Sequence, residues 1–234
     1  MFKALVLCSL LLAPVISQFS SSSSSESCED DRGFGGGGRP GGGRPGGGRP
    51  GNGGGGPNGG CESGWRRFNR PSGGWCIRVF GGRINRPTAE TQCRSQGATL
   101  SGVQNLEETK YITSQALRVV TSQTSTSVWI GAVRTAACNK QGLTASCTPQ
   151  NSFRWTDGST TGIAGFIWEY GQPDNAHSRT QNCVVALASP SSVRVGTQTW
   201  QPNNLDDTDC SLISPTTPHP RAVLAYACGK RPTS

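Results

Sequence analysis

The sequence predicts an α+β domain in which disulfide bonds stabilise two helices, short antiparallel strands and a long loop region. Two helical segments come early in the region 61–228, and short apolar strand segments follow them around a stretch rich in Gly, Pro, Asn and Asp. Eight cysteines share this region with all six tryptophans and with several aliphatic runs. Its length suits one domain.

The first strand should cover residues 74–80, with Cys76 inside it. The first helix should cover 87–96, because Pro87 stands near its start and Gly97 lies just past its end.

The second helix should run from Asn105 to about Val120. Asn105 is followed three residues later by Glu108, which is the spacing of a capping box. Ile112, Ala116 and Val120 then recur at helical spacing and predict the buried stripe of this helix.

Only strands are expected after the second helix, at 128–132, 153–155, 184–188 and 223–228. The stretch 157–182 predicts long loops. Long loops inside a compact domain usually carry function.

The N-terminal segments predict secretion. Residues 1–17 have the pattern of a signal peptide, with a basic start, an apolar run too short to span a bilayer and a small-residue cleavage site. Residues 18–60 form a low-complexity, glycine-rich tail with three Gly-Gly-Gly-Arg-Pro repeats, and they predict a disordered spacer. The tail lacks interleaved aromatics and follows a signal peptide, so no nucleic-acid partner is expected. No later segment predicts a membrane span, and 229–234 is a short C-terminal tail.

Nine of the ten cysteines remain after the signal peptide is removed. Cysteines in a secreted chain are normally bridged, and Cys28 is left over in the tail. It predicts either a bridge between two chains, giving a homodimer, or a free thiol. Cys138 and Cys147 most simply close a local loop, since neither histidine is close enough in sequence to favour a zinc site. The formal net charge of +8 favours anionic surfaces or glycans as partners.

The candidate functional residues form two clusters of oxygen-bearing side chains, each near a cysteine. If Cys183 and Cys210 are bridged, the two clusters become the walls of one site. Calcium prefers about six to eight oxygen ligands, charged and neutral. A Q-P-D tripeptide alone would be an ordinary turn, but the second cluster favours a calcium site. The candidate ligands are Gln172, Asp174, Gln181, Asp206 and Asp207.

Residues 61–228 resemble the long form of the C-type lectin-like domain family. The resemblance rests on an ordered set of features: an N-terminal hairpin with Cys61 and Cys76, the run Trp129-Ile130-Gly131-Ala132, the pair Cys93 and Cys228, and the inner pair Cys183 and Cys210. It implies that each of these cysteine pairs is a disulfide.

The resemblance also implies a calcium ion held by Gln172-Pro173-Asp174, a later polar residue and Asp207, with two sugar hydroxyls completing its shell. Pro173 should follow a cis peptide bond. The chain departs from the family pattern at Leu205 in place of a tryptophan, Asp206 in place of an asparagine and Gln181 in place of a glutamate.

These departures reverse two donor–acceptor pairs that would contact sugar hydroxyls, Gln172 with Asp174 and Gln181 with Asp206. The family's Q-P-D form implies galactose-type ligands, whereas a complete reversal leaves mannose-type vicinal hydroxyls as the second option. His177 lies in the same loop and is a further candidate for ligand contact.

The sequence therefore predicts a secreted, calcium-dependent lectin that binds glycans or glycoproteins. The rival prediction is a lectin-like interaction module that binds protein or another non-sugar ligand without calcium. Enzyme function is not expected, because neither histidine lies near a nucleophile motif.

Overall fold

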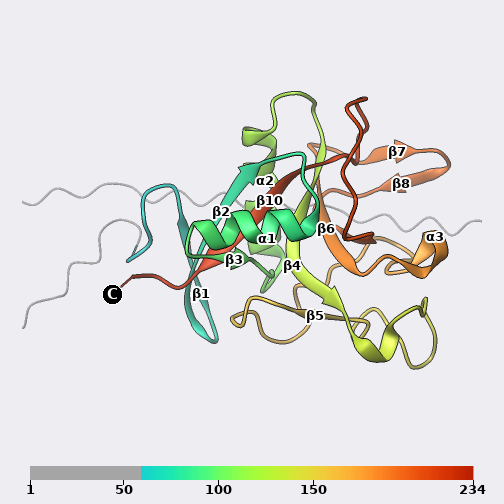
Figure 1. Cartoon of the computed structure of the whole chain (residues 1–234), viewed down its shortest axis with the longest axis horizontal. Coiled ribbons are helices and arrows are strands. Elements are labelled where there is room, and N and C mark those ends of the chain that lie inside the picture. Colours follow the sequence, from blue (N-terminus) through green and yellow to red (C-terminus); the bar gives the residue numbers. More distant parts are fainter. Residues whose placement is uncertain (1–58, 234) are drawn as a thin grey trace, which may run out of the picture. The chain divides into compact units, whose positions relative to one another are not determined.

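The computed structural model describes residues 59–233 as an eight-stranded mixed sheet with two helices packed beside it (Figure 1). The predictions for the signal peptide, most of the tail and Cys28 lie outside these residues. No helix in the described part of the chain has the length and apolar character to cross a membrane. The strands are β1 (Arg66–Arg70), β2 (Gly73–Gly81), β3 (Thr99–Leu100), β4 (Thr126–Arg134), β5 (Phe153–Trp155), β6 (Cys183–Ala188), β7 (Val193–Val195), β8 (Gln198–Trp200), β9 (Leu205–Thr208) and β10 (Val223–Lys230). The helices are α1 (Arg86–Ser95), α2 (Leu106–Val119) and the short α3 (Ala176–Arg179), with a 3-10 turn at Ala136–Cys138.

The strand order of the main sheet is β1-β2-β10-β4-β6-β9, with β3 paired to β10 and β5 paired to β4. All pairs in this sheet are antiparallel except β4 with β10, which run parallel with Tyr226 opposite Trp129. The all-antiparallel prediction was wrong at this pair. Parallel neighbours need a long crossover connection, and here most of the domain lies between the two strands.

Both predicted helices are present, and both begin at an asparagine cap. The Asn85 side chain accepts a hydrogen bond from Thr88 N (3.0 Å), and the Asn105 side chain accepts one from Glu108 N (3.1 Å). Glu108 does not return the bond to Asn105 as a full capping box would; its Oε2 accepts from Gln104 N (2.8 Å). The reason is that the Glu108 carboxylate forms an ion pair with the buried guanidinium of Arg70.

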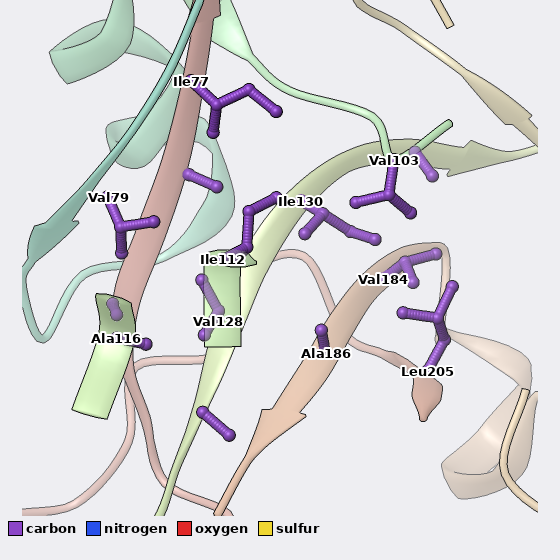
Figure 2. Close-up of a cluster of buried hydrophobic side chains, with 14 of the residues drawn as sticks. Ile77, Val79, Val103, Ile112, Ala116, Val128, Ile130, Val184, Ala186 and Leu205 are labelled. Carbon is purple, nitrogen blue, oxygen red and sulfur yellow. The ribbon is translucent and has the colours of Figure 1, made fainter. Parts of the chain in front are cut away.

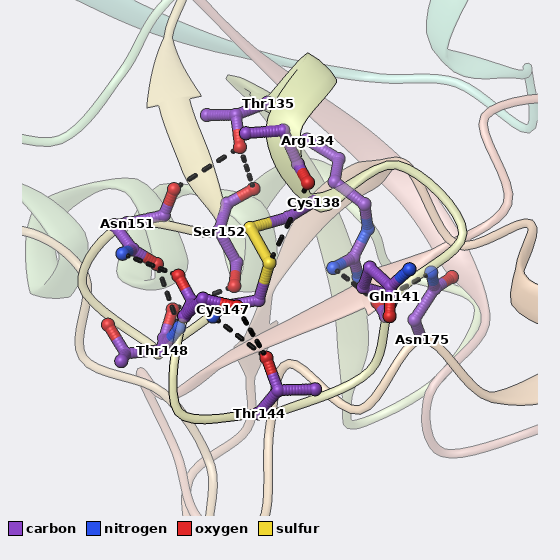
Figure 3. Close-up of a disulfide and its surroundings, with 12 residues drawn as sticks. Arg134, Thr135, Cys138, Gln141, Thr144, Cys147, Thr148, Asn151, Ser152 and Asn175 are labelled. Carbon is purple, nitrogen blue, oxygen red and sulfur yellow. Dashed lines mark hydrogen bonds between the residues drawn. A yellow bond between two sulfur atoms is a disulfide. The ribbon is translucent and has the colours of Figure 1, made fainter.

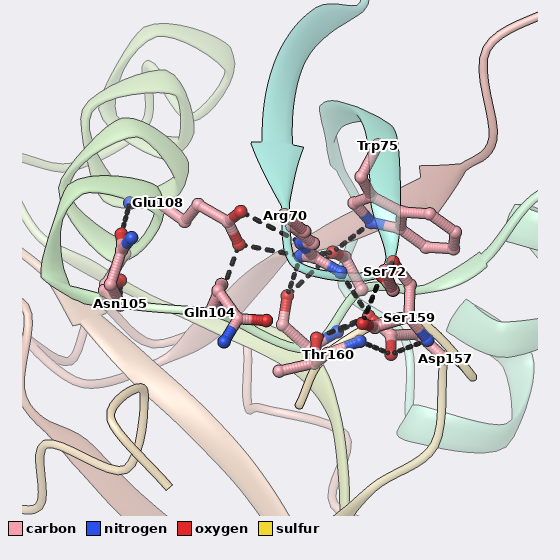
Figure 4. Close-up of polar contacts among 12 residues, drawn as sticks. Arg70, Ser72, Trp75, Gln104, Asn105, Glu108, Asp157, Ser159 and Thr160 are labelled. Carbon is pink, nitrogen blue, oxygen red and sulfur yellow. Dashed lines mark hydrogen bonds and ion pairs between the residues drawn. The ribbon is translucent and has the colours of Figure 1, made fainter. Parts of the chain in front are cut away.

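Arg70 connects three segments at one end of the sheet (Figure 4). From the end of β1 it donates to both oxygens of Glu108 on α2, at 2.9 and 2.7 Å, and to Asp157 Oδ2 at 2.9 Å. Its side chain is fully buried, as is that of Asp157. The sequence reasoning did not single out this cluster.

The predicted stripe of α2 packs on the sheet. Ile112 and Ala116 are fully buried and Val120 is nearly so. Figure 2 shows the aliphatic cluster that they join, to which strands from both halves of the chain contribute, among them Ile77, Val128, Ile130, Val184 and Leu205.

Gly131 in β4 is required by the close approach of another strand. A Cβ at this position would lie 2.1 Å from Leu100 O, and Gly131 N donates to Ser101 O at 2.7 Å. The central strand can therefore pass β3 only if this residue has no side chain.

Four disulfides join the eight cysteines of the described region, as predicted. Cys183–Cys210 links the start of β6 to the residue two positions after β9. The pairs are Cys61–Cys76, Cys93–Cys228, Cys138–Cys147 and Cys183–Cys210.

Candidate functional site

The two predicted clusters meet where β6 and β9 pair. Asp206 and Asp207 lie on β9, opposite Val185 and Val184 of β6, and Gln181 comes two residues before β6 begins. The sequence predicted no strand at the Asp-Asp segment, which the structure places on β9. The Cys183–Cys210 bridge closes this end of the pair, as the site prediction required.

The Q-P-D loop is held by its own side chains. The Gln172–Pro173 peptide bond is cis, as predicted. Gln172 Oε1 accepts from Asp174 N, and Asp174 Oδ1 accepts from Ala176 N, both at 2.9 Å. One side-chain oxygen of Gln172 and one of Asp174, both predicted calcium ligands, are therefore used to fix the turn.

Asp207 is fully buried and paired with an arginine. Its Oδ2 accepts from the guanidinium of Arg134, at the end of β4, and from Asn175 N at 2.8 Å. Burial raises the pKa of Asp207 to about 6, against the opposing effect of Arg134. The sequence reasoning missed Arg134, although a single charged residue at the end of an apolar strand was a usable signal.

Asp206 is nearly buried and has a different partner. Successive side chains of a strand point to opposite faces. Its Oδ2 accepts from the Arg221 guanidinium, which lies 3.3 Å above the centre of the Trp200 ring. Burial raises the pKa of Asp206 to about 7, while Arg221 acts to lower it.

As they lie, these residues do not fit a calcium ion. Asp207 pairs with Arg134 and Asp206 with Arg221. Arg179 Nη1 donates to Asp174 O at 2.8 Å. Two guanidinium groups thus pair with the two aspartates of β9, whereas Arg179 binds only the backbone carbonyl of Asp174. The negative charge that Asp206 and Asp207 would offer a divalent cation is therefore compensated. Within residues 59–233, no group of three or more His, Cys, Asp or Glu side chains is placed to hold a metal ion. Calcium binding by Gln172, Asp174, Gln181, Asp206 and Asp207 stays a prediction.

A cavity of about 650 Å³ opens on the Asp206 side of β9. This volume is in the usual range for small-molecule sites. Asp206, Gln181 and Arg221 supply polar groups to its lining, and Leu212, Val185 and Val223 supply apolar ones. His177, the predicted contact residue, lies on its lining and is exposed; His219 also lines it.

The mixed sheet, two flanking helices, inner disulfide and cis-proline loop define a C-type lectin-like domain. A family model described as C-type lectin domain-containing protein 141/158 matches residues 66–231, and the chain belongs to this family. Members of the C-type lectin family are in general binding modules rather than enzymes.

The chain is also similar to the versican core protein of Homo sapiens, at 32% identity over 126 residues. The match covers 54% of this chain and 3% of versican. Among solved structures, it is similar to the cow CD23 carbohydrate-recognition domain, crystallised with an oligosaccharide (19% identity, 74% of this chain, 98% of the other, TM-score 0.46). It is similar as well to the C-type lectin CEL-I from Cucumaria echinata (19% identity, 72% and 96% covered, TM-score 0.47).

Proposed function

We propose that the domain is an extracellular carbohydrate-binding module whose ligand enters the cavity beside β9. The observation that carries the proposal is the Asp206–Arg221 pair on the lining of that cavity. A sugar hydroxyl is both a donor and an acceptor, and a carboxylate beside a guanidinium offers both complements at one place. Leu212 and Val223 supply apolar surface for the C–H face of a sugar ring.

Asp206 has capacity left for a ligand. Only its Oδ2 is bound by Arg221, and no donor in the described part of the chain is hydrogen-bonded to Oδ1. The guanidinium is held in place by its stacking on Trp200, so it is pre-organised to donate. A ligand hydroxyl that bridged the two groups would replace water without breaking the ion pair.

The competing form of this proposal is calcium-bridged binding through the Q-P-D and Asp-Asp motifs. The ion pairs of Asp206 and Asp207 favour direct hydrogen bonding without the metal. The sugar class stays a prediction from the sequence. The Q-P-D motif indicates galactose-type ligands, and its reversed polarity indicates mannose-type ligands.

The proposal is tested by binding of the full chain to immobilised glycans, with calcium and with EDTA. We expect equal binding in both conditions, with methyl mannoside and galactose as competitors to define the class. The variant D206N/R221Q should weaken binding by roughly 10- to 100-fold, the value of one charge-assisted hydrogen bond. Both charges are removed together, so that none is left buried alone.

The matched control is Arg194→Gln, which changes an arginine on β7, outside the cavity lining. It should leave binding unchanged. Binding that disappears in EDTA would support the calcium-bridged form instead. An absence of binding in both conditions would reject the carbohydrate proposal.

A second candidate function, binding of a protein partner, is favoured by one observation. Tyr170 is 93% exposed immediately before the Q-P-D loop, and Ile163 is 53% exposed in the same long loop region. Exposed tyrosines are frequent anchors of protein interfaces. Tyr170→Ala would abolish such an interaction and leave sugar binding in the cavity intact.

Secretion and dimerisation are part of the proposal. The four disulfides of the described region fit an oxidising compartment. N-terminal sequencing of the secreted protein should begin at Gln18. A covalent dimer on a non-reducing gel should be lost in Cys28→Ser, and a dimer that persists would exclude this cysteine.

A further inference from the structure

We propose that the guanidinium of Arg134 is a built-in cation, which occupies an oxygen cage that would otherwise recruit a divalent metal ion. The loops around the candidate site are then ordered without calcium, and removing the guanidinium converts the cage into a calcium site. This proposal does not depend on sugar binding.

Arg134 donates to three oxygens from three different segments. Its Nε binds Gln181 O at 2.9 Å, its Nη1 binds Gln141 O at 3.3 Å, and its Nη2 binds the carboxylate of Asp207. The guanidinium carbon lies 4.5 Å from the centre of the Phe153 ring, and only 1% of the side chain is exposed. This cation is therefore withdrawn from solvent and surrounded by oxygens.

Asn175 completes the cage and connects its parts. It is fully buried in the left-handed region, with φ of 51°. Its side chain donates to Gln141 O and accepts from Gln181 N, both at 2.9 Å, while its own N–H binds Asp207 Oδ2. Figure 3 shows Arg134 and Asn175 meeting at Gln141, within the loop that Cys138–Cys147 closes. Arg134 and Asn175 together thus fasten the 138–147 loop, the end of the Q-P-D loop, the residue Gln181 before β6, and β9.

Two oxygens of the cage residues are buried without a partner in the described part of the chain, Asp207 Oδ1 and Gln181 Oε1. If Arg134 were absent, they would be joined by the three oxygens that it now binds. That set holds one carboxylate, one side-chain amide and two backbone carbonyls, which is the ligand chemistry that calcium selects. Because an uncompensated buried carboxylate is costly, the vacated cage should attract a cation.

The other buried arginine of the domain lacks this property. Around Arg70, Asp157 is also bound by the backbone N–H groups of Gly102, Ser159 and Thr160, and no oxygen of Asp157 or Glu108 is left unpartnered. Backbone N–H groups cannot coordinate a metal ion. Arg70→Met is therefore a suitable control, since it also removes one buried arginine that forms a buried ion pair.

The experiment measures the Tm of the full chain in millimolar calcium and in EDTA. We expect no difference for the wild-type protein. Arg134→Met should lower the Tm in EDTA and recover about 5–10 °C in calcium at a hundredfold excess over its Kd. The recovery should be lost in R134M/D207N and absent in Arg70→Met.

A Tm rise of the wild-type protein in calcium, or a calcium titration of it with measurable heat, would overturn the proposal. So would a calcium response of Arg134→Met that is no larger than that of Arg70→Met. If Arg134→Met does not fold, Arg134→Gln takes its place, because its amide keeps a donor for Asp207, and the same two outcomes apply to it.

Discussion

Replacement of Arg70 by Met should be the most destabilising single change at a position remote from the candidate site. Arg70 makes five hydrogen bonds from a fully buried side chain. Removing one partner of a buried ion pair costs about 3–5 kcal/mol, because a charge is left without compensation. Asp157 would keep four of its donors, two of them from Thr160, whereas Glu108 would keep only Gln104 N. The penalty therefore falls mainly on Glu108, and we expect a loss of about 4 kcal/mol.

The measurement is urea unfolding of the full chain with disulfides intact, followed by tryptophan fluorescence. Trp75 is a suitable reporter because its ring lies 5.0 Å from the Arg70 guanidinium. The double variant R70M/E108Q should recover about half of the loss, since no charge is then buried at position 108. An R70M protein within about 1 kcal/mol of wild type would refute this reasoning, as would an R70M/E108Q protein that is no more stable than R70M.

Three further predictions concern stability. Burial raises the pKa of Asp157, but its hydrogen bonds from backbone amides and the Arg70 guanidinium outweigh burial and hold it below its usual range. The stabilisation is present above the ordinary pKa of about 3.9 and is lost as pH falls through the folded value. The Asp157→Asn variant should thus have a lower free energy of unfolding than wild type at neutral pH, and that free energy should fall less on acidification. The same fall with acid in the variant and in wild type would contradict this. Paired Cys→Ser replacement should cost about 5 kcal/mol at Cys93–Cys228 and about 2.6 kcal/mol at Cys138–Cys147, because the bridges span 135 and 9 residues. Equal losses in urea unfolding would count against the chain-entropy account. Gly131→Ala should cost about 1–3 kcal/mol, because its Cβ would meet Leu100 O; a loss below about 0.5 kcal/mol would show that β3 can move aside.

The helices and main strands were predictable from the sequence because their signals are local. The Asn caps, the Ile112–Ala116–Val120 stripe and the apolar run of β4 depend on residues a few positions apart. The short strands β3, β7, β8 and β9 were not predicted. A strand of two to four residues with charged or polar members gains its stability from neighbours outside its own segment.

The sequence by itself indicated that the Q-P-D and Asp-Asp segments lie near each other, through the ordered cysteines and the two oxygen-rich motifs. The tertiary structure alone decided what these residues contact. Asp207 and Arg134 are 73 positions apart, and Asp206 meets Arg221 from a loop after β9. Such pairs depend on strand register, because a shift of one residue would exchange the faces to which the two aspartates point. An aspartate is written the same way in the sequence whether its carboxylate contacts a metal ion or a guanidinium. Only the tertiary structure decides which of these cations lies beside it.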